Sequence, residues 1–207
     1  MWLNIMNDKN NAINTLDDFI MVVDGMIPQD CIDDLLKEYK TSSAWMDYAP
    51  GKSGGDSPAT SILLTHPTVV KDSPVRQELM NRLGKYIFEG FDQYHKKYSK
   101  RDEGRNILDI SELVGLRLLK YKKGQSIFKH VDKYTNPDTN VSIWPVVTFT
   151  LSINSNFSGG ELELLDGRCV YEAKAGQCVF FPANFLFPHE VKTVTRGIRY
   201  AIVGWFV

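Results

Sequence analysis

The C-terminal half of the chain is a series of short apolar segments that Gly, Pro, Asn and Asp residues interrupt at regular intervals. In chain order these segments are ELVGLRLLKY, WPVVTFTLSIN, GELELL, CVYEA, QCVFFP, HEVKTV and IRYAIVGWF. Apolar and polar residues alternate in several of them, which is typical of strands with one buried face. Several short strands at regular spacing predict a β-sandwich, a jelly roll or a barrel.

The N-terminal half has a different pattern, in which helical periodicity dominates. The segment IPQDCIDDLLKEYK predicts a helix, and the apolar runs at 19–23 and 61–65 predict strands on either side of it. Ser73-Pro74 predicts the start of a long helix, because Ser is a favourable N-cap and Pro fits the first helical position. Helices therefore come first, and an all-β region follows.

Residues 49–58, APGKSGGDSP, form the strongest loop signal in the chain. Such a segment buries little apolar surface, so we expect it to be mobile and to serve either as a lid that closes over a pocket when substrate arrives or as an ordinary linker. The length of the chain predicts one domain over 1–207. We expect 1–107 to be a mainly helical support region and 108–207 to be the catalytic core.

Composition excludes several classes of function. The formal net charge is −1, so we expect neither a nucleic-acid nor a membrane partner. The sequence shows no signal-peptide pattern and no apolar stretch of the roughly 18 residues that a membrane helix needs. Cys31, Cys169 and Cys178 are odd in number and form no C-x-x-C pair, which argues against a disulfide framework. These features predict a cytoplasmic protein.

His130 and Asp132 stand two residues apart in YKKGQSIFKHVD. In an extended segment, residues i and i+2 point to the same side, so the imidazole and the carboxylate leave the backbone together. His189, in FPHEV, supplies a second histidine. Two histidines and one carboxylate on one face are the ligand set of a non-haem Fe(II) site with open positions. H-x-D alone is a weak signal, and the surrounding residues strengthen it.

A hairpin with its turn centred on Arg196 joins HEVKTV to IRYAIVGWF on this reading. Residue 189 then pairs with 203, so His189 and Arg199 share a face at a separation of about 14 Å along the strand. That span fits a small dicarboxylate, held by a metal at one end and by the Arg199 guanidinium at the other. Arg196 is expected at the turn tip, in solvent.

Hydroxyl side chains alternate with apolar ones in VVTFTLSIN, where Thr148, Thr150 and Ser152 share one face. The apolar face is expected to pack on the core. The hydroxyl face is expected either to meet water or to line a pocket where hydroxyls bind a carboxylate. Tyr121 is expected to add its phenol to the same pocket or to pack in the core.

The segment from about 113 to 207 resembles the prolyl 4-hydroxylase-like branch of the Fe(II)/2-oxoglutarate dioxygenases. The matching elements, in order, are LRLLKYKKGQSIFKHVD, TFTLSINSNFSGGELEL, AGQCVFFPANFLFPHEV and VTRGIRYAIVGWF. The most specific features are SGGELEL and a His that is followed ten residues later by Arg-Tyr-Ala in a strand ending in Trp. The resemblance implies an α+β fold with a double-stranded β-helix (jelly-roll) core, buttressed by the N-terminal helices.

The same resemblance implies roles for individual residues. His130, Asp132 and His189 would bind Fe(II), Arg199 would bind the distal carboxylate of 2-oxoglutarate, and Tyr121 would contact this co-substrate. Some relatives carry a second carboxylate-binding Tyr where this chain has Ser152, so that contact would either be lost or fall to Ser152, Thr150 or water. The implied activity is hydroxylation of a C–H bond with O2 as second co-substrate, succinate and CO2 as products, and ascorbate as an optional reductant.

The sequence leaves the substrate open. A prolyl residue of a protein or peptide, as for procollagen-proline 4-dioxygenases, is the leading interpretation, and a free amino acid or other small molecule is the second. The third is a non-catalytic jelly roll that binds metal or ligand, which Arg199 disfavours. Arg117 shares a strand face with Tyr121, while Tyr134 and Trp144 lie in 133–144, an expected rim loop. Arg117, Tyr134 and Trp144 are candidate substrate contacts, with ordinary packing as the alternative.

Overall fold

The computed structural model describes residues 15–48, 59–66, 69, 73–99, 110, 112–136 and 139–207. Its helical elements are η1 (Leu16–Phe19), α1 (Gln29–Tyr39) and α3 (Pro74–Ser99). The strands are β1 (Met21–Val23), β2 (Met46–Tyr48), β3 (Ala59–Leu63), β4 (Leu113–Lys122), β5 (Ile127–His130), β6 (Tyr134–Thr135), β7 (Ser142–Ile143), β8 (Val147–Ser152), β9 (Ser158–Gly159), β10 (Leu162–Leu164), β11 (Cys169–Tyr171), β12 (Cys178–Pro182), β13 (His189–Val191), β14 (Val194–Arg196) and β15 (Ile198–Phe206).

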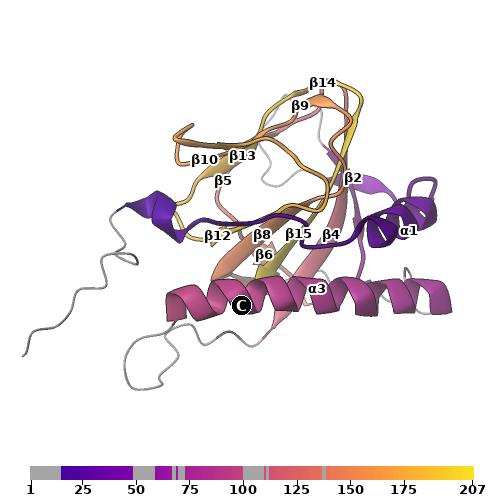
Figure 1. Ribbon diagram of the computed structural model, residues 1–207, viewed down its shortest axis with the longest axis horizontal. Coiled ribbons are helices and arrows are strands. Elements are labelled where there is room, and N and C mark those ends of the chain that lie inside the picture. The colour runs from indigo at the N-terminus through magenta and orange to yellow at the C-terminus, as the bar shows by residue number, and fades with distance from the viewer. Residues whose placement is uncertain are drawn as a thin grey trace, which may run out of the picture.

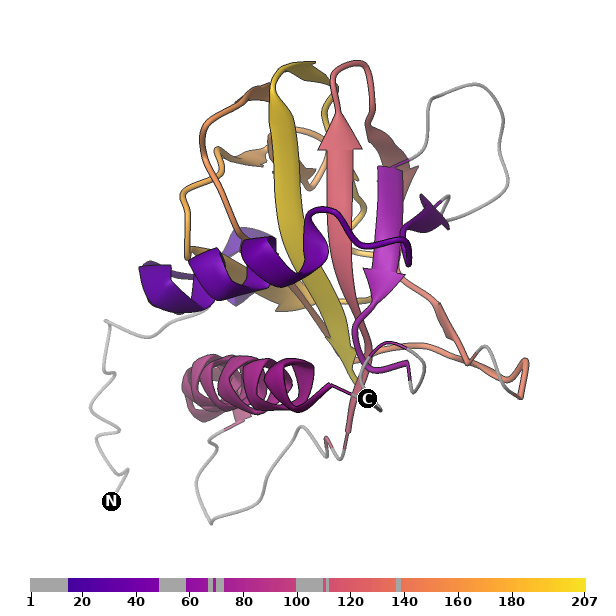
Figure 2. The same ribbon diagram turned by 90° about the vertical axis from the view of Figure 1, so that its right-hand side faces the viewer.

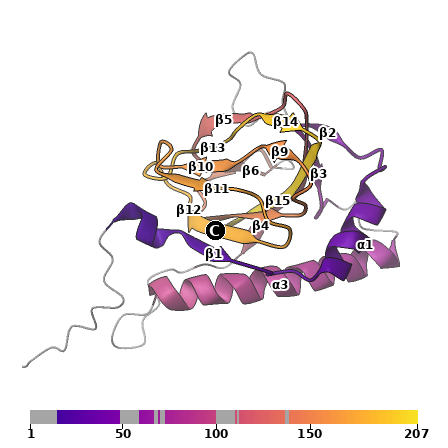
Figure 3. The same ribbon diagram turned by 45° about the horizontal axis from the view of Figure 1, so that its top comes forward.

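Two facing sheets build a jelly roll (Figure 3). Seven of the described strands form the larger sheet, in the order β1-β12-β8-β15-β4-β3-β2, and four form the smaller sheet, in the order β11-β10-β13-β5. The ribbons β14-β9 and β6-β7 complete the β structure. The predicted α+β jelly roll is confirmed. The N-terminal half contributes β1, β2 and β3 to the larger sheet, in addition to its helices.

Helices α1 and α3 cover the outer face of the larger sheet (Figures 1 and 2). The predicted start of the long helix is confirmed, because the Ser73 hydroxyl accepts a hydrogen bond from the Arg76 N–H at 3.3 Å and Pro74 is the first helical residue. Leu79, Leu83 and Ile87 form a buried stripe on α3 that packs against the sheet.

Both faces of β8 are buried, and they serve different purposes. Val147, Phe149 and Leu151 belong to the core between the larger sheet and the helices. The alternate residues of this strand, which carry hydroxyls, point into the space between the two sheets. One strand thus completes a hydrophobic core on one side and supplies polar groups to an interior cavity on the other.

The predicted hairpin between HEVKTV and IRYAIVGWF is wrong. Strand β13 pairs with β10 and β5 in the smaller sheet, whereas β15 pairs with β4 and β8 in the larger sheet. Between them β14 pairs with β9, and Gly197 turns the chain with φ of 79°. The alternation of apolar and polar residues along a strand is the same whether the next strand in the chain pairs with it or joins the opposite sheet. The sequence pattern therefore could not tell a hairpin from two strands in different sheets. His189 and Arg199 therefore come from opposite sheets.

Two loop predictions have different outcomes. The expected rim loop at 133–144 contains a short ribbon, in which Tyr134 pairs with Ile143 and Thr135 with Ser142. The expected lid at 49–58 lies outside the described residues.

The two glycines Gly159 and Gly84 give opposite predictions for stability. Gly159 has φ of 71°, and a Cβ there would lie 2.3 Å from the backbone oxygen of Thr193. Gly159→Ala should therefore lower the free energy of unfolding by more than about 1 kcal/mol. Gly84 lies inside α3, where an added Cβ would meet no atom within 4 Å. Gly84→Ala should therefore raise the free energy of unfolding by roughly 0.5–1 kcal/mol. Urea unfolding of both variants tests the pair, and equal effects would contradict the β9–β14 geometry.

Candidate metal centre and co-substrate cavity

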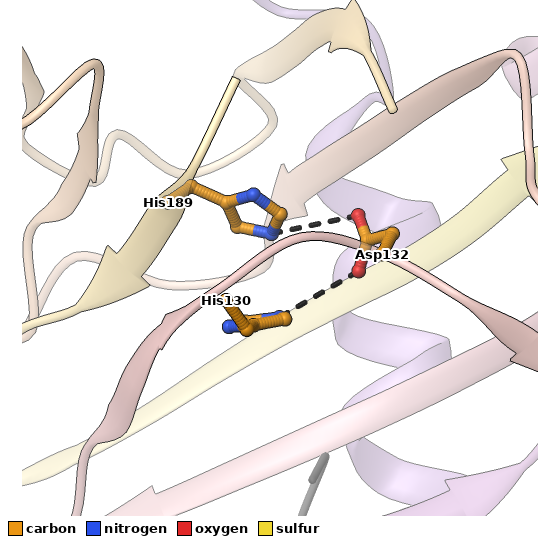
Figure 4. A group of neighbouring side chains, drawn as sticks. All are labelled: His130, Asp132 and His189. Atoms are coloured by element: carbon orange, nitrogen blue, oxygen red, sulfur yellow. Dashed lines mark ion pairs between the residues drawn. The ribbon is translucent and has the colours of Figure 1, made fainter. Parts of the chain in front are cut away.

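The two histidines His130 and His189 are direct cross-strand partners in the antiparallel pair of β5 and β13. Directly opposed side chains share a sheet face at close range, and the two imidazole centroids lie 4.4 Å apart. Asp132 follows β5 after one intervening residue and turns its carboxylate towards both rings (Figure 4). Ligand atoms of the three residues lie within 4.8 Å of one another. The structure thus brings together the three residues that the sequence indicated.

The hydrogen bonds of the two imidazoles leave Nε2, the ring nitrogen that faces Asp132, available for a metal. His130 Nδ1 lies 2.8 Å from the Phe128 carbonyl oxygen, and His189 Nδ1 lies 3.2 Å from that of Phe187. A carbonyl only accepts, so each neutral ring carries its proton on Nδ1 and keeps a lone pair on Nε2. Both Nε2 atoms face Asp132, at 3.6 Å for His130 and 3.4 Å for His189. Backbone contacts of this kind orient metal-binding histidines.

Asp132 is buried but remains ionised. Burial raises its pKa, yet the two histidines and the Thr148 hydroxyl, which donates to Oδ2 at 2.6 Å, together lower that pKa to about 2. Burial lowers the pKa of His189, which favours its neutral form. Burial opposes a rise for His130, but the hydrogen bond and the charge of Asp132 raise the pKa of His130. A buried carboxylate faced by two imidazole nitrogens needs a positive charge beside it, which either a proton on an imidazole or a metal cation supplies. The donor set, its tautomers and its charge therefore fit a divalent metal with open positions.

A cavity extends from these three ligands between the sheets. Its polar walls include Tyr48, Tyr121, Thr148 and Thr150, and the Trp205 indole also contributes. Its apolar walls are Leu119, Ile127, Leu162, Val191 and Val203. The structure thus places Tyr121 and Thr150 in the cavity. Ser152 is buried on the same face of β8 but does not line the cavity.

Arg199 lies fully buried beside the cavity, with 2% of its surface exposed. Its Nε and Nη1 have no hydrogen-bond partner among the described residues, and its guanidinium lies 4.8 Å from the Tyr121 ring centroid. Burial lowers the pKa of Arg199 and raises that of Tyr121 to about 12. Gly160 allows the close approach, because a Cβ there would lie 3.0 Å from Arg199 Cδ. Unpartnered buried N–H groups are costly, so this geometry calls for an anion.

The candidate substrate residues occupy different places. Arg117 is half-buried, and its guanidinium carbon lies 5.6 Å from the centroid of the Tyr48 ring. Tyr134 is half-buried against Trp205 at 6.0 Å between centroids, while Trp144 is 65% exposed. Sequence reasoning missed Tyr48, which lines the cavity from β2. No sequence signal marked it, because it directly precedes the loop-like segment at 49–58.

Residues 116–207 match the sequence profile of the 2OG-Fe(II) oxygenase superfamily. Over these residues, which are less than half of the chain, the sequence is similar to that superfamily. This match and the His-Asp-His triad together imply Fe(II), 2-oxoglutarate and O2 as the metal and co-substrates. The predicted resemblance to prolyl 4-hydroxylase-like oxygenases is confirmed by the relatives and structural neighbours of the chain.

A PKHD-type hydroxylase of Rippkaea orientalis is 37% identical over 91 residues, which are 42% of this chain and 39% of that protein. The chain therefore spans about two fifths of the length of the curated relatives it matches. The fold is similar to that of a prolyl-4-hydroxylase of Pseudomonas putida, with TM-score 0.63, 18% identity and coverage of 90% of this chain and 91% of that one.

A second solved structure with this fold is a prolyl hydroxylase of Trichoplax adhaerens in complex with a peptide fragment of the hypoxia inducible factor oxygen degradation domain. The TM-score is 0.63 at 18% identity, over 90% of this chain and 82% of that one.

None of the helices in the described part of the chain has both the length and the apolar content of a membrane span.

Metal binding should depend on the triad in a graded way. Ala in place of His130, Asp132 or His189 should abolish binding of Fe(II) or Mn(II), because each change removes one of three ligands. Thr148→Val should weaken binding by about 10–100-fold, because the hydroxyl only orients Asp132. Titration with Mn(II) followed by electron paramagnetic resonance measures both effects. Thr195→Val, at an exposed position of β14, is the control. Full metal content in all three Ala variants would refute the assignment.

Proposed function

We propose that the chain is an Fe(II)- and 2-oxoglutarate-dependent dioxygenase that hydroxylates a C–H bond of a prolyl residue in a protein or peptide, with release of succinate and CO2. One observation carries the proposal. A buried guanidinium with two unpartnered N–H groups lies beside a cavity that leads to a His-Asp-His ligand set. A dicarboxylate such as 2-oxoglutarate satisfies both features, with one end at the metal and the other at Arg199.

Each side chain has a defined part in this proposal. His130, Asp132 and His189 would hold Fe(II), which together with 2-oxoglutarate and O2 supplies the oxidising chemistry. Arg199 would hold the distal carboxylate of 2-oxoglutarate through the fork of its guanidinium. Tyr121, whose phenol stays protonated because its pKa is raised to about 12, can donate a hydrogen bond to the same co-substrate.

The hydroxyls on β8 divide the remaining work. Thr148 orients the Asp132 carboxylate, and Thr150 faces the cavity one step further along the same strand face. Ser152 is the cross-strand partner of Ala201, near the buried Arg199. Its hydroxyl would contact 2-oxoglutarate indirectly, through Thr150 or a water molecule. The apolar walls of the cavity, such as Leu119 and Val203, exclude water and strengthen the polar contacts within it.

Two considerations favour a prolyl residue as the substrate. Structural neighbours include a prolyl hydroxylase bound to a peptide and a prolyl-4-hydroxylase. Beside the metal ligands, the described cavity walls carry aliphatic, aromatic and hydroxyl groups and no ionised side chain. Such walls accept a neutral ring, and the Trp205 indole offers a flat surface for it. A free amino acid would bring two charges that these walls do not match.

Binding of 2-oxoglutarate should separate Arg199 from Arg196. Arg199→Lys should weaken binding by at least about tenfold although the charge is kept, because Lys cannot make the two-pronged contact. Arg196→Lys should leave binding unchanged, since Arg196 is exposed on β14. Calorimetric titration of 2-oxoglutarate into the Mn(II)-loaded protein without O2 measures both. The reverse ranking would place the co-substrate elsewhere.

Succinate formation is the direct test of the reaction and of its substrate. The Fe(II)-loaded protein should produce succinate slowly with 2-oxoglutarate alone and faster with capped Pro-containing peptides, which should gain one oxygen on proline by mass spectrometry. Acceleration by a free amino acid with peptides inert would favour a small-molecule substrate. Metal and 2-oxoglutarate binding without succinate from any member of a broad panel would indicate a non-catalytic jelly roll.

A further inference from the structure

Arg117 stands on the cavity side of the larger sheet. It lies on β4 at even spacing from Leu119 and Tyr121, which both line the cavity, so the three side chains leave the same face. Its partner on β15 is Val203, another lining residue. Val203 in turn pairs with Thr150 of β8. Arg117 therefore occupies the same row of the sheet as Thr150, two strands away.

Tyr48 holds the Arg117 guanidinium in place. Its ring lies 5.6 Å from the guanidinium carbon, which is a cation–π contact, and this ring lines the cavity from β2. Burial raises the pKa of the Tyr48 hydroxyl, the charge of Asp132 adds to that rise, and the charge of Arg117 opposes it. Tyr48 thus contacts Arg117 and lines the same cavity as the metal ligand Asp132.

Arg117 has a positive charge that the described residues do not neutralise. None of the ion pairs found among them includes Arg117, whereas Arg76, Arg82 and Arg168 each pair with a carboxylate. It is half-buried, so its charge is only partly screened by water. A guanidinium held on an aromatic ring that lines the cavity, without an acidic partner among the described residues, is suited to binding a carboxylate from outside the chain.

The distance between Arg117 and the metal centre indicates which kind of carboxylate can reach the Arg117 guanidinium. Thr148, whose hydroxyl binds Asp132 at the metal centre, lies two strands away from Arg117 and two residues further along the sheet, so their backbones are about 12 Å apart. The guanidinium leans further away, towards Tyr48 on the far side of β4. An extended peptide advances about 3.3–3.6 Å per residue and needs about three residues to cover this distance. The α-carboxylate of a free amino acid lies too close to its own side chain to do so.

We propose that Arg117 and Tyr48 form a subsite for an acidic side chain of the substrate, about three residues away from the residue that is hydroxylated. This proposal rests on the proposed function and makes the substrate an acidic peptide segment. Arg199 and Arg117 then have separate tasks. The fully buried Arg199 binds the co-substrate, and the half-buried Arg117 selects the peptide.

Equilibrium binding of capped peptides tests the subsite without requiring turnover. The probes are fluorescent octapeptides with one central Pro and a single Asp, Asn or Lys scanned through every other position. They are titrated by anisotropy into protein loaded with Mn(II) and 2-oxoglutarate, without O2. The wild-type protein should prefer Asp over Asn by about fivefold at one position, two to four residues from Pro, which is a modest value for a partly exposed charge pair.

Charge reversal separates recognition from folding. Arg117→Glu should lose the preference for Asp and prefer Lys at that same position, a gain that an unfolded protein cannot show. Tyr48→Leu should reduce the Asp preference, because the guanidinium loses its support. Arg196→Glu, which reverses an exposed charge on β14, should retain the wild-type preference.

The outcomes distinguish this subsite from the reaction itself. Equal affinity of the wild-type protein for Asp and Asn peptides at all positions would overturn the subsite, as would an Asp preference that survives Arg117→Glu. Tight, Arg117-dependent binding of free amino acids with peptides unbound would overturn the peptide as the source of the carboxylate. An Asp preference that swaps in Arg117→Glu, without hydroxylation of any peptide, would support the subsite and count against prolyl hydroxylation.

Discussion

The pairing of β5 with β13 is the constraint on which the site depends. It makes His130 and His189 direct partners, and a one-residue slip of either strand would turn one imidazole to the opposite face. Each Nδ1 also lies beside the backbone carbonyl two residues earlier in its own segment, and this local contact sets the tautomer. Asp132 needs only the chain direction after β5 and one hydroxyl, that of Thr148, to complete the ligand set.

Thr148 belongs to the opposite sheet, and that connects the metal centre to the rest of the fold. The helices α1 and α3 bury the outer face of the larger sheet, which includes Phe149 and Leu151 of β8. Packing on that face fixes the position and direction of the alternate residues Thr148 and Thr150, which point to the other side of the strand. The helices therefore contribute to the cavity without any of their side chains lining it among the described residues. Rigid support of this kind is what a preorganised site requires.

Residue chemistry was easier to predict than residue placement. The H-x-D pair, the second histidine and the alternation of hydroxyls in VVTFTLSIN identified side chains that the structure brings together or turns into the cavity. The relation of His189 to Arg199 was predicted wrongly, because alternation carries no information about which strand is the neighbour. Tyr48 was missed since its strand, β2, has only three residues, and its position depends on pairing with β3. Long-range pairing of this kind is decided by tertiary contacts that no local window contains.

The strand order also bears on how the protein folds. β1 pairs with β12, β3 with β4, and β5 with β13, so the sheets close through segments that lie far apart in the chain. Chains with such high contact order fold slowly, because loop-closure entropy is lost before distant contacts form. His130 and His189 meet only when the smaller sheet has assembled, so a newly made chain offers no complete ligand set until late in folding. Binding of iron would therefore indicate that the smaller sheet of the jelly roll has assembled.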